Sequence, residues 1–450
     1  MKTRLCFFDD YYIAARPGTV RRMFRPQKLG EFHDGTDRLQ TYTSFFFDPR
    51  VEKYRLYYEV PKRGTGTEVR ELILAQADCV EDLINQKAEL IPVSGLDENG
   101  IHGCSVMWDE RTGEYLLAGN FHANDRQKRR MFTARSKDGI SFFDMRCLYE
   151  DYSDTYNSLY YNPHLGEYVI TMRAAVMDRR IAVMRSKDFL TWSDPEMILH
   201  PTAANGEGMQ YYALGVSETE GVFYGLLWRF MTDIGQADFS DMCGYMENDL
   251  YYSYDGIHFC STGLSPVAER PLPPEYGCSQ LWLLNACNTR DGRTILCGGA
   301  SRIAHGSSYP NDDKFCNTVF YEIPKDGFVA LEGFGKSSIV YTKPILMERD
   351  EIFLNYNATR GELSVAILEV DGTPIEGYGF EDCIPMVERS VNAPVCWRKD
   401  ERRESLAGKR VRLAFRLNSA LLWTVSFDGK PYLKKIQKSF FDARAEFDAR

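Results

Sequence analysis

The 450-residue sequence has no long hydrophobic run, since no stretch of it approaches the length of a membrane-spanning helix. Such a helix needs about 20 consecutive apolar residues, so we expect no membrane span. The sequence also has no basic run: Asp and Glu total 64 against 54 for Lys and Arg, and the net charge is −10. A chain with this charge repels nucleic acid and anionic lipid, and we expect neither as a partner.

The motifs of several protein classes are also missing. The 7 His are dispersed without metal-binding spacing and the 12 Cys include no Cys-x-x-Cys pair, so we expect no metal site. There is no phosphate-cradling glycine loop, no Gly-x-Ser-x-Gly elbow and no dinucleotide fingerprint, so we expect no cofactor. Asp9 and Asp10 stand where a signal peptide needs apolar residues, which predicts a cytoplasmic protein with mostly free thiols.

Aromatic residues are abundant, at 13% of the chain, and stand in short alternating runs between turn residues, a pattern typical of strands. Three such segments align without gaps, each reading as a strand, a polar turn opened by Asp or Asn, and a second strand: Ser44–Tyr54, Ser105–Tyr115 and Ser158–Tyr168. Looser copies span Tyr212–Arg229 and Leu281–Gly299. Five copies of one unit predict a repeat architecture.

A second repeated element follows three of these copies, with the pattern Ser-x-Asp-(Gly/Phe)-x-x-aromatic: Ser136–Phe142, Ser186–Trp192 and Ser253–Phe259. The pattern predicts a tight turn in which Asp binds the following backbone and Gly takes a positive φ. A residue that recurs in every copy serves the fold, so we predict structural roles for the recurring turn acids and amide: Asp138, Asp188, Asp255, Asp48, Asp109 and Asn162.

Five units of four short strands, at a period of roughly 50 residues, predict an all-β chain that begins with a five-bladed β-propeller over residues 1–325. We expect Arg4–Phe8 to close the ring by pairing into the last blade. After Phe328 the strands become longer and alternate apolar and polar residues, which predicts a C-terminal β-sandwich over residues 326–432 and a tail over 433–450.

The repeats resemble those of the five-bladed propeller glycosidases in the superfamily that holds glycoside hydrolase families 32, 43, 68 and 130, above all bacterial proteins labelled family 32-like. The segments that carry this resemblance are Cys6–Ala14, Val20–Arg22, Asp154–Ser158, Arg173, Arg179–Ile181, Ser186–Trp192, Thr342–Pro344, Phe380–Cys383 and Leu406–Leu413. The resemblance implies a glycosidase with its site at the mouth of the axial channel. The Asn-Asp-Pro-Asn-Gly loop of family 32 is absent, so fructosidase activity in particular is not implied.

Equivalent positions of the repeats suggest the catalytic residue. Eight residues before each turn stand Gln40, Ile101, Asp154, Met209 or Gln210, and Gln280. Asp154 is the acid of this set and is our candidate nucleophile or base. Glycosyl transfer needs a second carboxylate across the scissile bond. We rank the acids at other blade entrances in the order Glu207, Glu275 and Asp97 (or its neighbour Glu98), and each of these could instead be a solvated loop acid.

Further residues are candidates for binding the substrate: Arg173, Tyr212, Trp228 and His305, with Asp97 as a polar contact. An Arg beside Asp154 would orient its carboxylate, although a structural ion pair is the alternative. Tyr212 and Trp228 could stack on a sugar or pack between blades, and His305 could bind substrate or be satisfied within the fold.

The residues and the resemblance together predict hydrolysis of a glycosidic bond in a small oligosaccharide. Phosphorolysis is a second possibility, with inorganic phosphate held by Arg173, Arg179, Arg180 and Arg302. A propeller that binds glycans without cleaving them is the third, because function depends on the site and not on the scaffold. The sequence does not predict the oligomeric state.

Overall fold

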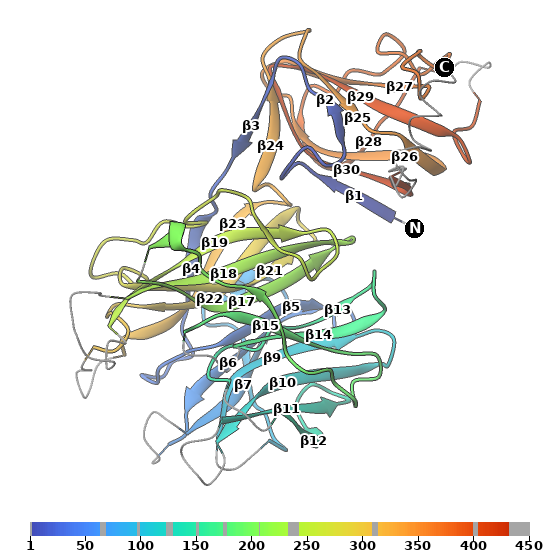
Figure 1. Ribbon diagram of the computed structural model, residues 1–450. Helices are drawn as coiled ribbons and strands as arrows, with labels where there is room; N and C mark the ends of the chain where they lie inside the picture. Colours follow the sequence, from blue (N-terminus) through green and yellow to red (C-terminus); the bar gives the residue numbers. More distant parts are fainter. Residues whose placement is uncertain are drawn as a thin grey trace. The chain divides into compact units, whose positions relative to one another are not determined.

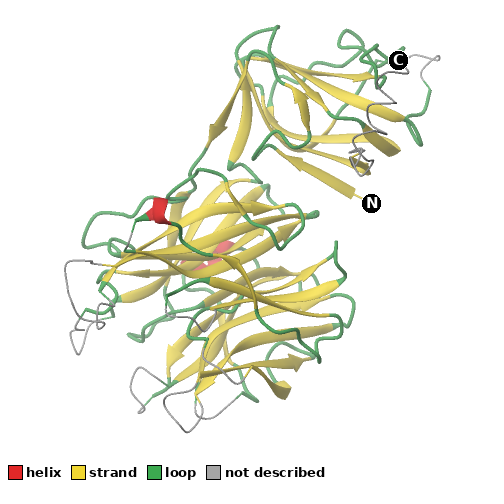
Figure 2. Ribbon diagram, viewed as in Figure 1, coloured by secondary structure: helices red, strands yellow, loops and turns green. Residues whose placement is uncertain are grey.

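The computed structural model describes residues 2–63, 69–96, 100–122, 129–149, 153–173, 178–206, 208–232, 243–307, 314–398 and 404–431. Nearly every element is a strand (Figure 2), and the described helices are two short segments, α1 (Val80–Ile84) and the 3₁₀ turn η1 (Ala203–Asn205). The chain forms two compact units, one of residues 25–325 and one of residues 1–24 with 326–450. The protein is all-β, a five-bladed propeller followed by a β-sandwich.

The unit of residues 25–325 is built from blades of antiparallel strands (Figure 1). Blade one contains β5 (Thr43–Asp48), β6 (Lys53–Pro61), β7 (Arg70–Ala77) and β8 (Glu89–Pro92). Blade two contains β9 (Ile101–Asp109), β10 (Glu114–His122), β11 (Arg129–Ser136) and β12 (Phe142–Tyr149). Blade three contains β13 (Leu159–Asn162), β14 (Glu167–Arg173), β15 (Ile181–Ser186) and β16 (Glu196–Leu199). Blade four contains β17 (Met209–Thr219), β18 (Val222–Thr232), β19 (Gly244–Ser253) and β20 (Cys260–Ser261). Blade five contains β21 (Gln280–Asn288), β22 (Arg293–Ser301), β23 (Cys316–Pro324) and β4 (Gln27–Phe32).

The inner strands contact one another in a closed circle, in the order β5, β9, β13, β17, β21 and back to β5. Strand β4, from the N-terminal side of blade one, pairs with β23 as the outermost strand of blade five and so closes the ring. The expectation that Arg4–Phe8 closes it is wrong. Instead β1 (Lys2–Cys6) pairs with β30 (Ala420–Pro431), because Leu5 and Phe7 bury their side chains in the core of the sandwich.

Five hydrogen bonds also run around this circle, and they explain why Ser recurs in the aligned repeats. In each, a side-chain oxygen of one inner strand accepts the backbone N–H of the next: Ser44 from Val106, Ser105 from Leu159, Ser158 from Val216, Ser217 from Ala286, and Asn285 from Phe45. The first four distances are 2.9 Å and the last is 3.1 Å. Every blade is thus tied to both of its neighbours, and the circle is complete.

The recurring turn residues have the structural roles that the repeats predict. The Asp138 carboxylate accepts the backbone N–H of both Ile140 and Ser141 at 2.8 Å. Asp188 and Asp255 make the same pair of bonds in their own turns. The turn acids of the inner hairpins link blades, since Asp48 accepts the hydroxyl of Tyr115 and Asp109 that of Tyr168. These acids are therefore committed to the fold.

Apolar side chains fill the spaces between blades, which is why the strands are rich in aliphatic and aromatic residues. Leu56 and Phe320 pack between blades one and five, and Leu74 and Phe132 between blades one and two. The remaining interfaces are filled in the same way, for example by Ile170 and Met131 between blades two and three. These stacks hold the blades at fixed angles and so position the residues at the centre.

The other unit is a sandwich of two layers. One layer contains β1, β3 (Thr19–Met23), β24 (Val329–Gly333), β26 (Ile345–Asn357), β28 (Arg389–Pro394) and β30. The other contains β2 (Ile13–Ala15), β25 (Ile339–Thr342), β27 (Glu362–Leu368) and β29 (Arg410–Asn418). Alternate residues of both layers, such as Leu354 and Phe415, form the core between them. A buried ion pair between Arg4 and Asp326 ties the two chain segments of this unit together. The predicted tail, residues 433–450, lies outside the described residues.

Candidate active site

Asp154 lies five residues before the start of inner strand β13, at the end of the channel where the inner strands begin. Its side chain is 17% exposed, so the carboxylate can meet a ligand while its neighbours hold it. Oδ1 lies 3.1 Å from Nε2 of His102, and Oδ2 lies 3.9 Å from Nη1 of Arg173. His102 comes from blade two and Arg173 from the end of β14 in blade three. Strand pairing thus brings a donor and a cation to one carboxylate.

Two further charged residues lie behind His102. Nη1 of Arg70, at the start of β7, is 3.1 Å from Nδ1 of His102 and 3.6 Å from Oε2 of Glu59 on β6. The Glu59 side chain is fully buried, and its Oε1 accepts the backbone N–H of Cys104 at 2.7 Å. We call Glu59, Arg70, His102 and Asp154 the carboxylate–histidine chain. It crosses from blade one to blade three at the channel mouth.

Sequence reasoning missed His102, Arg70 and Glu59. Counting back from the turn selects Ile101, which is buried between blades. However, β9 carries a bulge next to Gly103, where the register against β10 shifts, and a bulge changes which of two neighbouring side chains faces the channel. Gly103 has φ +63°, and a Cβ there would lie 1.9 Å from the Thr155 carbonyl oxygen. A Gly two residues after the equivalent position was the one available signal.

Buried aromatic side chains close the channel below Asp154: Tyr42, Tyr156, Tyr212, Trp228 and Trp282. Trp228 is 3% exposed, with its indole stacked between Tyr212, at 4.4 Å between centroids, and Trp282, at 5.2 Å. No indole face is left for a sugar, so we assign Trp228 to packing between blades instead of substrate stacking. Tyr212 is also covered on its ring, by Trp228 and by the Arg173 guanidinium at 4.4 Å, and it serves to seat that arginine.

Two other residues adjoin Tyr212. His305, in the loop after β22, has its Nε2 3.3 Å from the Tyr212 hydroxyl. The guanidinium of Arg179 lies 5.1 Å from the Tyr212 ring centroid, and its Nη1 donates to Oε1 of Gln210 at 2.6 Å. The structure therefore brings together five of the eight residues singled out from the sequence: Asp154, Arg173, Tyr212, Trp228 and His305.

The sequence offers three candidates for the second catalytic carboxylate, and none of them is placed beside Asp154 by the described residues. The structure does not bring Glu275 to Asp154: its side chain is 57% exposed and pairs with Lys28 on the outermost strand of blade five, at 3.1 Å. Glu207 and Asp97 lie outside the described residues. Of the acids that the structure describes in the carboxylate–histidine chain, Asp154 is the exposed one and Glu59 the buried one.

The tyrosines beneath the site carry no charge at neutral pH. Burial raises the pKa of Tyr42, and the neighbouring Tyr212 raises it further, against the opposing influence of Arg70 and Arg173. Burial likewise raises the pKa of Tyr156 to about 12, although a hydrogen bond from Asn285 lowers it in part. Tyr42 and Tyr156 therefore contribute no negative charge to the site.

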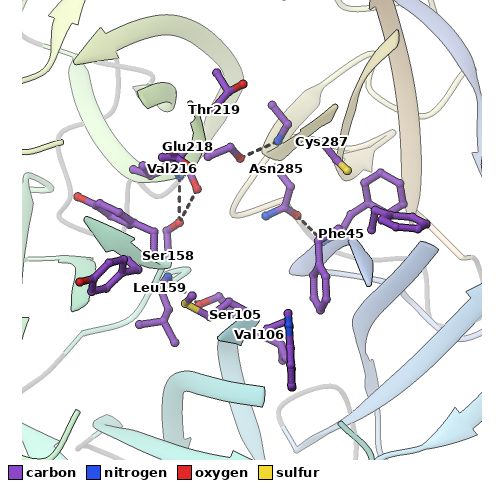
Figure 3. A pocket seen from close by; sticks show the side chains of 18 of the residues that line it. Phe45, Ser105, Val106, Ser158, Leu159, Val216, Glu218, Thr219, Asn285 and Cys287 are labelled. Atoms are coloured by element: carbon purple, nitrogen blue, oxygen red, sulfur yellow. Dashed lines mark hydrogen bonds between the residues drawn. The ribbon is translucent and has the colours of Figure 1, made fainter. Parts of the chain in front are cut away.

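A cavity of about 750 Å³ occupies the other end of the channel (Figure 3), between the carboxyl-terminal halves of the inner strands. Ser105, Ser158 and Asn285 line it, but their oxygens serve the circle of hydrogen bonds between blades. Three acids line it: Asp109 accepts the Tyr168 hydroxyl, Glu218 accepts the backbone N–H of Gly221, and Glu110 is exposed. The hydroxyl and amide oxygens of this cavity are thus engaged within the fold, and Asp154 lies at the opposite end of the channel.

Within the described ranges, no three His, Cys, Asp or Glu side chains are grouped so that they could hold a metal ion. Nor does that part of the chain contain a helix long and apolar enough to cross a membrane. All 12 cysteines are free thiols.

No protein-family model and no curated protein matches the sequence. Solved structures with a similar fold include one named as a glycoside hydrolase, with a TM-score of 0.47 and 13% identity over 67% of this chain and 94% of its own. A second is an N-acetylgalactosamine deacetylase from F. plautii in complex with blood group B trisaccharide. Its TM-score is 0.46 and its sequence identity is 10%, over 68% of this chain and 96% of its own. A third is a family 32 β-fructofuranosidase from Bombyx mori, with a TM-score of 0.43 and 11% identity over 91% of this chain and 94% of its own. Similarity at this level does not indicate which activity this protein has.

Proposed function

We propose that this protein hydrolyses a glycosidic bond of a small oligosaccharide at the Asp154 end of the channel. The observation that carries the proposal is the Asp154 carboxylate, which is partly exposed at the channel mouth and lies 3.1 Å from an imidazole of one blade and 3.9 Å from a guanidinium of its own. Acids that serve the fold, such as Asp138, are saturated by backbone N–H groups of their own turn. Asp154 instead faces an imidazole and a guanidinium, which orient a carboxylate for work on a ligand.

In the reaction, Asp154 either attacks the anomeric carbon or takes a proton from the water that attacks it. In both cases the glycosidic C–O bond breaks, and a second acid protonates the leaving oxygen. Glu207 remains our candidate for this acid on the sequence argument alone. The positive charge that develops on the sugar ring would be stabilised by the Asp154 carboxylate.

Phosphorolysis is the second candidate, and the arginines favour it. Arg173 and Arg179 both approach the ring of Tyr212, at 4.4 and 5.1 Å, next to Asp154. Two guanidinium groups on one platform suit a phosphate oxyanion, which would replace water as the attacking group. A product with phosphate on its anomeric carbon would identify this reaction.

The test is a panel of small oligosaccharides incubated with the protein, with and without inorganic phosphate, and analysed for released sugars. Hydrolysis predicts free reducing sugar at a rate that phosphate does not change. Sugar 1-phosphate formed only with phosphate would replace hydrolysis by phosphorolysis. Binding of a sugar without turnover, by wild type and by Asp154→Asn alike, would make the protein a glycan-binding propeller and end the enzyme proposal.

A further inference from the structure

The contacts of His102 determine where its proton lies. The imidazole makes two contacts at hydrogen-bond distance, Nε2 with Asp154 and Nδ1 with Nη1 of Arg70, both at 3.1 Å. A guanidinium has donors and no acceptor, and it does not lose a proton in proteins. Nδ1 must therefore accept from Arg70, and a nitrogen that accepts carries no hydrogen.

With Nδ1 unprotonated, the proton of the neutral ring is on Nε2, which donates it to the Asp154 carboxylate. The competing arrangement is a charged imidazolium between two carboxylates, since Glu59 is also near. Its Oε2 lies 3.9 Å from Nδ1, beyond hydrogen-bond distance, whereas Nη1 of Arg70 lies at bonding distance from the ring. Tyr42 packs its ring edge-on to the imidazole, at 4.8 Å between centroids, and stays uncharged.

We infer that His102 is a positioning residue, held neutral with its proton on Nε2 by Arg70, and that buried Glu59 keeps Arg70 in place for this purpose. The inference rests on the proposed function in that Asp154 is the group being positioned. Asp154 then receives a hydrogen bond that a deprotonated Nε2 could not give, and the ring cannot take the proton that Asp154 removes. Glu59 balances the charge of Arg70 without reaching the substrate, since its side chain is fully buried.

The charged and titratable groups that face the ring come from every side of it. Asp154 stands on one side with Arg173 beyond it, Arg70 and Glu59 on the other, and Tyr42 on the edge. Arg70 opposes protonation of the ring by its charge and by the hydrogen bond, whereas the two carboxylates favour it. The hydrogen bond from Arg70 outweighs the two carboxylates and keeps the ring neutral, because a second hydrogen on Nδ1 would point at a guanidinium N–H.

The test is nitrogen NMR of the full-length protein labelled at its histidine rings, which reports the protonation of each ring nitrogen and needs no turnover. The His102 signal is assigned by its loss in His102→Gln. We expect Nδ1 to stay unprotonated and Nε2 protonated from pH 5 to 8. A proton on Nδ1 of His102 in this range would overturn the inference.

Variants separate the roles within the chain. Arg70→Met removes the donor, and the ring of His102 should then take a second proton below neutral pH; an unchanged ring would contradict the role of Arg70. Glu59→Gln keeps an acceptor for the Cys104 N–H but removes the charge that holds Arg70, so the Nδ1 signal should move towards that of a ring nitrogen without a donor; an unchanged Nδ1 signal would contradict the role of Glu59. Arg180→Met, which removes a guanidinium paired with Asp178, is the matched control and should leave His102 unchanged.

Steady-state kinetics test the positioning role of His102 independently of the NMR experiment. His102→Leu should lower kcat about 10- to 100-fold at nearly constant KM, the effect of one charge-assisted hydrogen bond, while His102→Gln, which keeps an N–H near the Nε2 position, should restore part of it. If no glycoside is turned over, the proposed function fails, and the NMR result still decides the protonation of His102. If turnover is normal in His102→Leu, the positioning role is wrong although the activity stands.

Discussion

The circle of hydrogen bonds between blades makes a quantitative prediction for Ser158→Ala. The Ser158 side chain is 2% exposed, and its Oγ is the acceptor for the Val216 N–H at 2.9 Å. Alanine leaves this N–H buried without its acceptor, which costs about 1–3 kcal/mol. For a unit of this size, each kcal/mol lowers Tm by about 2–4 °C or less, so a fall of a few degrees is expected.

The assay is the propeller transition in thermal and urea unfolding, compared with Ser141→Ala as a matched control. Ser141 is exposed, and its hydroxyl meets only that of Ser94, at 3.3 Å. Its loss should change the free energy of unfolding by less than about 0.5 kcal/mol. If Ser158→Ala were no more destabilising than Ser141→Ala, the hydrogen bonds between blades would not be closing the ring in the way that we argue.

Three further predictions follow from single residues. Burial opposes ionisation of Asp255, but hydrogen bonds from His258 and the turn backbone lower its pKa to about 2, below the 3.8 of a free side chain. Its contribution to stability is therefore present above about pH 4 and lost as the pH falls towards 2, and urea unfolding across this range should show less pH dependence in Asp255→Asn. Glu275→Gln, which breaks only the exposed pair with Lys28, should cost at most about 1 kcal/mol and leave initial rates unchanged; a large rate loss would return Glu275 to the site. Arg173→Lys keeps a charge but loses the planar fork over Tyr212, and it should raise KM or lower kcat in steady-state assays, while Arg135→Lys, at an arginine over the ring of Phe189, does neither.

The repeats predicted the blades well because each copy carries its own turn chemistry. The residue that opens each turn is visible in the alignment, and the structure gives Asp138 the backbone bonds that the pattern implies. The N-terminal strand was misplaced for the opposite reason. Lys2–Cys6 and Gln27–Phe32 both form short strands, and only packing against the rest of the chain decides which one joins blade five.

At the site, Asp154 was predictable because it departs from its equivalents in the other repeats. His102 was hidden by the bulge at Gly103, which shifts the register of β9. Arg70 and Glu59 were hidden because they come from the third and second strands of a different blade and reach Asp154 only through His102. Contacts of this kind depend on how blades meet, and no local pattern in the sequence records them.

The central claim is that Asp154 is the residue that acts on the glycosidic bond, and Asp154→Asn tests it most directly. The substitution keeps the size of the side chain and removes its negative charge, and the matched control is Asp138→Asn in a structural turn. Initial rates on a cleaved oligosaccharide and Tm are measured for both variants. We expect Asp154→Asn to lose several orders of magnitude in kcat with Tm near that of wild type, and Asp138→Asn to lose stability but keep its rate per folded molecule. Normal turnover by Asp154→Asn would show that the residue is structural and that the proposed site is wrong.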